Sequence, residues 1–280
     1  MSATGSSDRI RFLRETIAGL EQAGGSLASP AASARACAFG ALDQPCGLDR
    51  ALGGLFSDAL YEVAPARMND GAAACGFAAG LAQRFAATSP GALIFISDEF
   101  STRENGAPYG LGLAAHGLDL ARLLYVRTIG AQDLLWASEE SLRAGAAACV
   151  LIDLGSAARA FDLVAARRLT LAARMSGTPA VLLHSPTAFQ KQQAQNGARM
   201  RFEIRSTHSA EPHKERRPIP GLAHLAVRFA KAGVSAGRLT GLDTDQFRTF
   251  IWDHQNGCFK DNLSLALPTF SRFGAQHARA

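Results

Sequence analysis

The sequence of 280 residues has no long apolar run. Residues 148–152 and 180–183 are among its longest runs, far short of the roughly 20 residues that a membrane-spanning helix needs. The first residues also lack the basic start and apolar stretch of a secretory signal. We therefore expect no membrane span and a cytoplasmic location.

Cysteine is scarce, odd in number and scattered, at Cys37, Cys46, Cys75, Cys149 and Cys258. No two of these residues form a C-x-x-C pair, and none lies at metal-site spacing from a histidine. We expect reduced thiols, most of them small core residues, and no metal site.

The composition is that of a globular protein. Hydrophobic residues make up 48% of the chain and charged residues 19%, which suits one large or two modest domains with a sizeable core. The net charge of +5 fits an acidic partner or nucleic acid, but such an excess is also common in proteins that bind neither.

Near the start of the chain, residues 8–23 predict an amphipathic helix. Ile10, Leu13, Ile17 and Leu20 recur at helical spacing, with charged residues between them. A glycine pair ends the pattern, and a linker rich in Gly, Ser, Ala and Pro follows. The helix packs on its own domain or is offered to another subunit or partner, and the pattern leaves both open.

From residue 60 the chain alternates short apolar strands with helices of 10–15 residues, which predicts a βαβ series and a mainly parallel sheet. We expect strands at 60–64, 91–97, 123–126, 148–154 and 179–184, and helices at 72–86, 109–120, 131–144 and 161–175. A short helix is expected before Gly53 and Gly54.

The pattern of apolar and polar residues changes after residue 198. Residues 199–205 alternate in period two, as in a half-exposed strand, and 222–229 and 246–252 look like further strands. We expect them to form an antiparallel C-terminal section, with a mobile polar loop at 207–220 between the first two.

Several segments resemble the RecA-like ATPase fold, and more narrowly the ImuA family of RecA-like accessory proteins, over residues 39–259. The segment Gly-Leu-Asp-Arg-Ala-Leu-Gly-Gly-Leu at 47–55 and the pair Glu62-Val63 resemble the frame of the phosphate loop. Residues 95–99 and 149–153 resemble the two strands that end in functional carboxylates. The other resembling segments are Asn-Gly-Ala-Arg-Met-Arg-Phe at 196–202, Trp252-Asp253 and Gly-Cys-Phe at 257–259.

The resemblance implies an α/β fold: a RecA-like three-layer core with a mainly parallel sheet and an antiparallel C-terminal section. We divide the chain into an N-terminal helix and linker (1–36), a core without a functional Walker A loop (37–260) and a C-terminal tail (261–280).

The phosphate loop itself departs from the pattern. Such a loop needs exposed backbone N–H groups, a Lys, and a Ser or Thr for magnesium. In one register Gly71 takes the Lys position, with Ala72 and Ala73 in place of the hydroxyls, and in the other Asp70 takes the Lys position. A carboxylate there repels phosphate. The full degenerate loop comprises Pro65, Arg67, Asp70, Gly71, Ala72 and Ala73, so we expect no cofactor and no enzyme activity.

Two carboxylates, Glu99 and Asp153, lie at strand ends where RecA relatives carry catalytic groups. Without a phosphate loop, we interpret them as relics that bond helix N-termini or lie exposed at the sheet edge. His184 resembles a γ-phosphate sensor, and a structural role is favoured for it. No nucleophile elbow is found.

Basic residues gather in the region where RecA proteins contact DNA: Lys191, Arg199, Arg201, Arg205, Lys214, Arg216 and Arg217. A solvated face is one interpretation, and a contact with DNA or an acidic partner is the other. Apolar residues of the tail, Phe270 and Phe273 among them, are further candidate contacts.

The resemblance implies a non-catalytic protein of SOS-induced, error-prone translesion synthesis. Its partners would be an ImuB-like polymerase homologue, an error-prone C-family DNA polymerase and, as a further candidate, RecA, with DNA contacted directly or indirectly. The alternatives are a residual nucleotide-dependent DNA-binding ATPase and a cell-division inhibitor of the SulA type.

Overall fold

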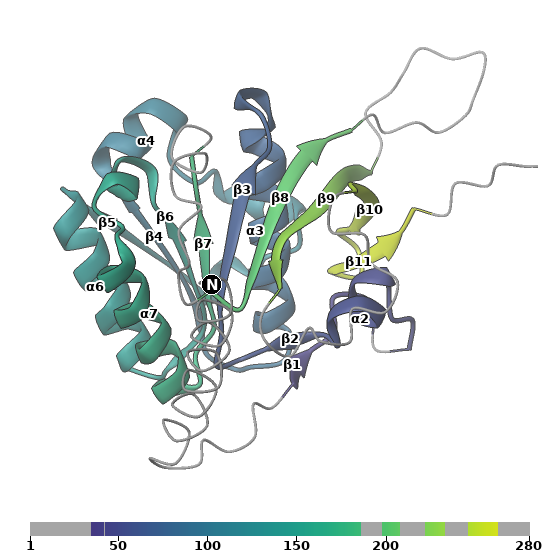
Figure 1. Ribbon diagram of the computed structural model, residues 1–280, viewed down its shortest axis with the longest axis horizontal. Coiled ribbons are helices and arrows are strands. Elements are labelled where there is room, and N and C mark those ends of the chain that lie inside the picture. Colours follow the sequence, from purple (N-terminus) through teal and green to yellow (C-terminus); the bar gives the residue numbers. More distant parts are fainter. Residues whose placement is uncertain (1–34, 42, 186–197, 208–221, 233–245, 263–280) are drawn as a thin grey trace, which may run out of the picture.

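The computed structural model describes residues 35–41, 43–185, 198–207, 222–232 and 246–262 (Figure 1). The elements in chain order are β1 Arg35–Cys37, α2 Gly47–Leu52, β2 Leu55–Phe56, β3 Leu60–Pro65, η2 Met68–Asp70, α3 Gly71–Ala86, β4 Ala92–Asp98, α4 Glu99–Asn105, α5 Gly110–Ala115, η3 Leu120–Arg122, β5 Leu123–Thr128, α6 Ala131–Arg143, β6 Ala147–Asp153, η4 Gly155–Arg159, α7 Leu163–Ser176, β7 Ala180–Leu183, β8 Met200–Ser206, β9 Ala223–Ala232, β10 Arg248–Asp253 and β11 Cys258–Asp261.

The described strands form a nine-stranded sheet of order β11-β10-β9-β8-β3-β7-β6-β4-β5 and a small sheet of β1 and β2. Neighbours from β8 to β5 pair in parallel. The last three strands continue the sheet in antiparallel pairs. The expected α/β class, with a mainly parallel sheet and an antiparallel C-terminal section, is confirmed, and the strand order is consistent with a RecA-like layout.

One face of the sheet packs against α3 through large aromatic side chains. Phe77 of α3 lies 5.2 Å from Phe202 and 5.0 Å from Phe259, measured between ring centroids. Gly80 allows this close approach, because an added Cβ there would lie 2.8 Å from Phe259 and 3.1 Å from Trp252. The small Ala and Gly side chains of α3 thus allow the helix to pack closely against the strands.

The opposite face is covered over part of its width by α6 and α7, which lie beside one another in Figure 1. Leu134 and Leu142 of α6, with Leu169 of α7, are buried against apolar strand residues such as Ile152 and Leu182. These helices and α3 sandwich the parallel strands, which explains why β4 and β6 are nearly continuous apolar runs.

Three predictions from the sequence were wrong, at β8, α5 and β11. β8 is not half-exposed, because β3 and β9 pair with it on either side and four of its seven residues are buried. α5 ends at Ala115 rather than near residue 120. β11 was not expected, and the predicted tail boundary at Asp261 falls inside it.

The predicted helix at 8–23, most of the predicted loop at 207–220, and the tail beyond Asn262 lie outside the described residues. Among the helices that are described, none combines the length and apolar character needed to cross a membrane. All five cysteines are free thiols, and all but Cys75 are buried. Burial, together with the charge of Asp49, raises the pKa of the Cys46 thiol to about 12.

Candidate functional site at the degenerate phosphate loop

The connection from β3 to α3 is short and regular. Pro65 ends the strand, Met68–Asp70 make one 3-10 turn, and Gly71 begins α3 with helical angles, φ −56° and ψ −46°. Because Gly71 does not adopt a positive φ, the loop does not make the wide turn that aims successive N–H groups at a phosphate.

Asp70 ties this connection to the end of β8. Asp70 is only 3% exposed. Its Oδ1 accepts hydrogen bonds from the Ser206 backbone N–H at 2.9 Å and from the Ser206 hydroxyl at 2.6 Å. The Ala66 N–H donates to the Ile204 carbonyl at 2.8 Å, so the loop is held at two points. A buried carboxylate therefore occupies the region where a phosphate loop would place its lysine.

The remaining loop residues supply no substitute chemistry. Arg67 is exposed, and the first turn of α3 carries Ala72 and Ala73, whose side chains have no oxygen for a magnesium ion. Among the residues that the structure describes, no group of three or more His, Cys, Asp and Glu side chains could hold a metal. Arg67 is the cation of this loop, but the described loop residues supply no cradle of N–H groups and no magnesium ligand beside it.

The carboxylates at the strand ends are engaged in capping. Asp98, fully buried, accepts a hydrogen bond from the Ser101 N–H at 2.6 Å and begins α4. Asp153 accepts from the Ser101 hydroxyl at 2.7 Å and the Gly155 N–H at 3.1 Å. Burial raises the pKa of Asp153 and the charge of Asp98 adds to the rise, while these two hydrogen bonds oppose it.

Glu99 lies one residue beyond the buried strand end and pairs with Arg103 at the surface, at 2.6 Å. Asp153 accepts its backbone hydrogen bond from Gly155, the first residue of η4. Asp98, whose capping role sequence reasoning missed, is the buried carboxylate of β4. The helix that it caps, α4, was not predicted either, so the available signal was only the residue type, because Asp is a preferred N-cap residue.

A second ionic group lies on the sheet face opposite α3. Glu62 of β3 is fully buried, and its Oε2 lies 2.5 Å from Arg201 Nε and 3.6 Å from His184 Nε2. Burial raises the pKa of Glu62, but His184 and Arg201 lower it by more, so it lies below the usual value. His184 is thus a buried neighbour of this pair, consistent with the structural role favoured for it.

Arg201 was expected among the DNA or partner contacts, and the structure corrects that placement. The residue is 6% exposed, and its guanidinium is bound to Glu62, which lies directly across the β3–β8 register. Arg199 lies immediately before β8, with its guanidinium 3.6 Å from the centre of the Phe56 ring. Of the other candidate contacts, Arg205 lies within β8. The rest fall outside the described residues: Lys191, Lys214, Arg216, Arg217, Phe270 and Phe273.

Exposed apolar side chains near the loop were not expected from the sequence. Met68 follows β3 and is 66% exposed, and Phe100 follows β4 and is 54% exposed. Because the carboxyl ends of parallel strands meet at one end of a sheet, both belong to the same end of the molecule. Here we use the name carboxyl-end set for the first exposed large apolar residues after β3, β4, β5 and β6: Met68, Phe100, Ile129, and the adjacent pair Leu163 and Val164.

Comparison with known proteins leaves the site to be interpreted from its geometry. No protein-family model matches the chain. A search of the curated proteins also finds no significant match. The closed loop, the capping carboxylates and the carboxyl-end set are therefore the basis for a functional assignment.

Proposed function

We propose that this chain is a non-catalytic, RecA-like accessory protein of damage-induced, error-prone translesion DNA synthesis, working in the cytoplasm through protein contacts. The observation that carries the proposal is the closure of the degenerate loop, in which Asp70 binds Ser206 at the place of a phosphate site. A RecA-like scaffold that cannot bind nucleotide retains only its surfaces for function.

The chemistry of the site argues against hydrolysis. A phosphoryl-transfer enzyme stabilises charge with a lysine, a metal and aimed N–H groups. In one register this chain has Gly71 at the lysine position and Ala72 and Ala73 at the hydroxyl positions, and in the other it has Asp70 at the lysine position. Gly71 has helical angles. Asp153, which would serve the metal, instead bonds Ser101 and Gly155.

The surface around the loop supports a binding role. Nucleotide sites place polar groups around the phosphates, whereas this end of the sheet exposes the side chains of Met68 and Phe100. Exposed apolar side chains at one end of a molecule favour a protein partner. RecA protomers assemble with one another, and a RecA-like chain that has lost its nucleotide site would also retain part of the surface through which protomers pair.

The choice of partners rests on the resemblance to the ImuA family. We propose an ImuB-like polymerase homologue and an error-prone C-family polymerase as partners, with RecA as a third. DNA would be reached directly or through them.

Co-purification after DNA damage tests the proposal. The tagged chain should capture both polymerase components, and the Met68→Glu/Phe100→Glu variant should bind them at least about tenfold more weakly, which corresponds to about 1.4 kcal/mol. Leu120→Glu is the matched control, because Leu120 is also exposed but precedes β5, away from the carboxyl ends. Failure of the unmodified chain to capture either component, or equal capture by both variants, would contradict the proposal.

A further inference from the structure

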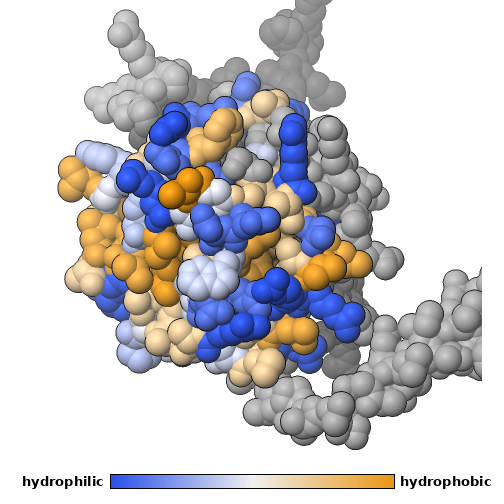
Figure 2. Space-filling view, turned by 90° about the vertical axis from the view of Figure 1, so that its left-hand side faces the viewer, coloured by the Kyte–Doolittle hydropathy of each residue, from blue (hydrophilic) through white to orange (hydrophobic). Residues whose placement is uncertain are grey.

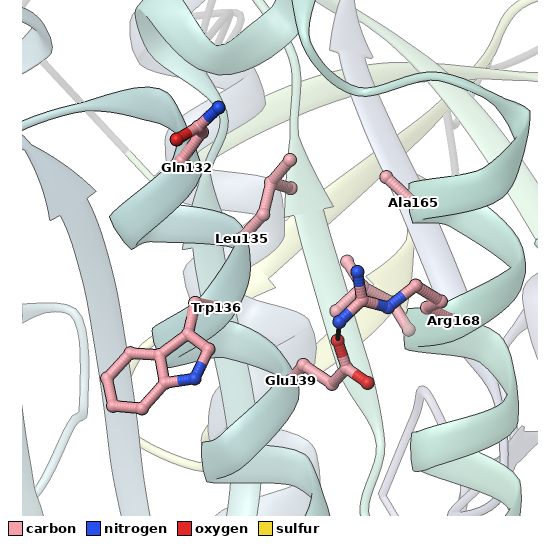
Figure 3. A pocket seen from close by; sticks show the side chains of 7 residues that line it. Gln132, Leu135, Trp136, Glu139, Ala165 and Arg168 are labelled. Atoms are coloured by element: carbon pink, nitrogen blue, oxygen red, sulfur yellow. Dashed lines mark ion pairs between the residues drawn. The ribbon is translucent and has the colours of Figure 1, made fainter.

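A groove runs between α6 and α7. The two helices run in the same direction, and side chains from both line two surface pockets of about 330 and 490 Å³ along it. The apolar lining residues are Leu135, Trp136, Ala165, Leu169, Leu171, Ala172 and Met175. In Figure 3, Leu135 points from α6 toward α7, while the Trp136 ring lies on the outer side of α6.

An ionic bridge crosses the groove between the two pockets. Glu139 of α6 is buried, and its carboxylate lies 2.5 Å from Arg168 of α7 and 2.5 Å from Arg143 (Figure 3 shows the first pair). Both arginines are more than half exposed. The bridge holds the two helices together at the middle of the groove and leaves an apolar pocket on either side.

Apolar side chains along the groove are left uncovered by the described residues. Met175 is 87% exposed and Leu171 47%. Figure 2 views the side of the molecule that carries α6 and shows hydrophobic residues interspersed with strongly hydrophilic ones. Uncovered apolar residues along a groove between two adjacent helices, with charges at the margins, suit a third amphipathic helix.

The two pockets repeat at a spacing that suits a helix. On α7, Ala165 lines the first pocket and Ala172 the second, one heptad apart or about 10.5 Å along a helix axis. In the helix predicted at 8–23, the pair Ile10 and Leu13 is followed one heptad later by the pair Ile17 and Leu20. Two apolar pairs of this helix thus match two apolar pockets.

The entry point of the N-terminal segment also suits this groove. The described chain begins in β1, which pairs with β2 just before β3. The first residue of β3, Leu60, lies opposite Ala180, which follows the end of α7 closely. Residues 24–34 can span up to about 36 Å when extended, at roughly 3.3 Å per residue, whereas α7 is about 21 Å long at 1.5 Å per residue.

We propose that the amphipathic helix predicted at residues 8–23 docks in the α6–α7 groove of its own chain and places its two apolar pairs in the two pockets. The C-terminal tail is the less suitable occupant, because it leaves the sheet from β11, at the edge opposite β5. This docking does not depend on the proposed function. It gives the chain an internal ligand that a partner helix would have to displace.

Photocrosslinking in the full chain tests the proposal. Met175 is replaced by the photoreactive residue p-benzoylphenylalanine, and mass spectrometry identifies the attached peptide. We expect the attachment to fall within residues 8–23. When isotope-labelled and unlabelled protein are mixed, both peptides of each crosslink should carry the same label, because the crosslink forms within one chain. The control places the same group at Arg167, which is exposed on α7 but lines neither pocket.

Crosslinks between labelled and unlabelled chains would assign the groove to a second copy and overturn the proposal. Attachment to residues 263–280, or equal attachment from Met175 and Arg167, would also overturn it.

Trypsin gives an independent readout, because the predicted helix contains Arg9, Arg11 and Arg14. Leu171→Glu places a charge in the second pocket and should accelerate cleavage at Arg14 about tenfold if docking is weakened by about 1.4 kcal/mol. Arg167→Glu should leave the rate unchanged. Equal rates in the two variants would contradict docking in this groove.

Discussion

The two faces of the nine-stranded sheet are held by different forces. On the α3 face, buried aromatic rings of Phe77, Phe202 and Phe259 interlock. On the opposite face, β8 and its neighbours carry ion pairs, Glu62 with Arg201 and Glu203 with Arg228. At β8 and its neighbours, the first face contributes stability through area buried from water, whereas the second depends on charge matching. Where α6 and α7 cover it, the second face is apolar as well.

β8 shows how one strand serves both faces. Met200, Phe202 and Ile204 belong to the aromatic core, while Arg201 and Glu203, at the alternate positions, form the ion pairs. The alternation of period two is therefore real, but it separates an apolar face from an ionic one rather than a buried face from a solvated one. The difference between the faces can be tested by removing one contact from each.

Phe77→Ala should give the largest effect, because it removes a fully buried ring from the aromatic face. We expect the free energy of unfolding to fall by about 4 kcal/mol, within the range of 3–5 for such truncations. Urea unfolding followed by circular dichroism measures the change. A loss below about 1 kcal/mol would mean that the rings do not form the main core.

Glu62→Gln should lower the free energy of unfolding by about 3 kcal/mol, because it leaves the Arg201 charge buried without its carboxylate partner. The matched control is the double variant Glu62→Leu/Arg201→Met, which replaces both charges by apolar groups and should unfold within about 1 kcal/mol of the unmodified chain. If the double variant is as unstable as the single one, the pair stabilises the fold in its own right and the contrast between the faces fails.

Ser206→Ala should lower the free energy of unfolding by about 1–2 kcal/mol, because it removes one of two hydrogen bonds to the buried Asp70 carboxylate. Thr207→Ala, next in the chain and exposed, is the control and should change stability by less than about 0.5 kcal/mol. Equal effects of the two substitutions would show that the loop is not closed through Ser206.

The smallest effect concerns pH. The pKa of Glu62 is lower in the folded chain than in the unfolded chain, where it is about 4.3. Its contribution to stability is therefore complete above that value and is lost as the pH falls through the lowered folded pKa. In Glu62→Gln the unfolding free energy should fall less steeply with acid below about pH 4.3 than in the unmodified chain. Parallel pH profiles would contradict the assignment.

Much of the architecture could be predicted from local sequence. The apolar runs of β4 and β6 and the Ala-rich sequence of α3 predict buried elements. The absence of the usual phosphate-binding side chains at Asp70–Ala73 can be read directly from the sequence. β11 was missed because it has only four residues, two of them polar and not buried, so its pattern does not stand out.

The contacts that define the site depend on pairing between distant segments. Glu62 and Arg201 are 139 residues apart, and Asp70 and Ser206 are 136 apart. Only the register of β3 beside β8 brings them together, and no local pattern encodes that register. For the same reason Arg201 looked like a surface base, and the exposure of Met68 and Phe100 could not be foreseen.

The central claim, that the degenerate loop is closed to nucleotide, is tested most directly by equilibrium binding of a fluorescent ATP analogue in the presence of magnesium. With Asp70 bound to Ser206 and no lysine or hydroxyl in place, we expect no saturable binding up to about 1 mM, a bound of about −4.1 kcal/mol. A dissociation constant in the micromolar range would contradict the closed loop and favour a nucleotide-dependent protein.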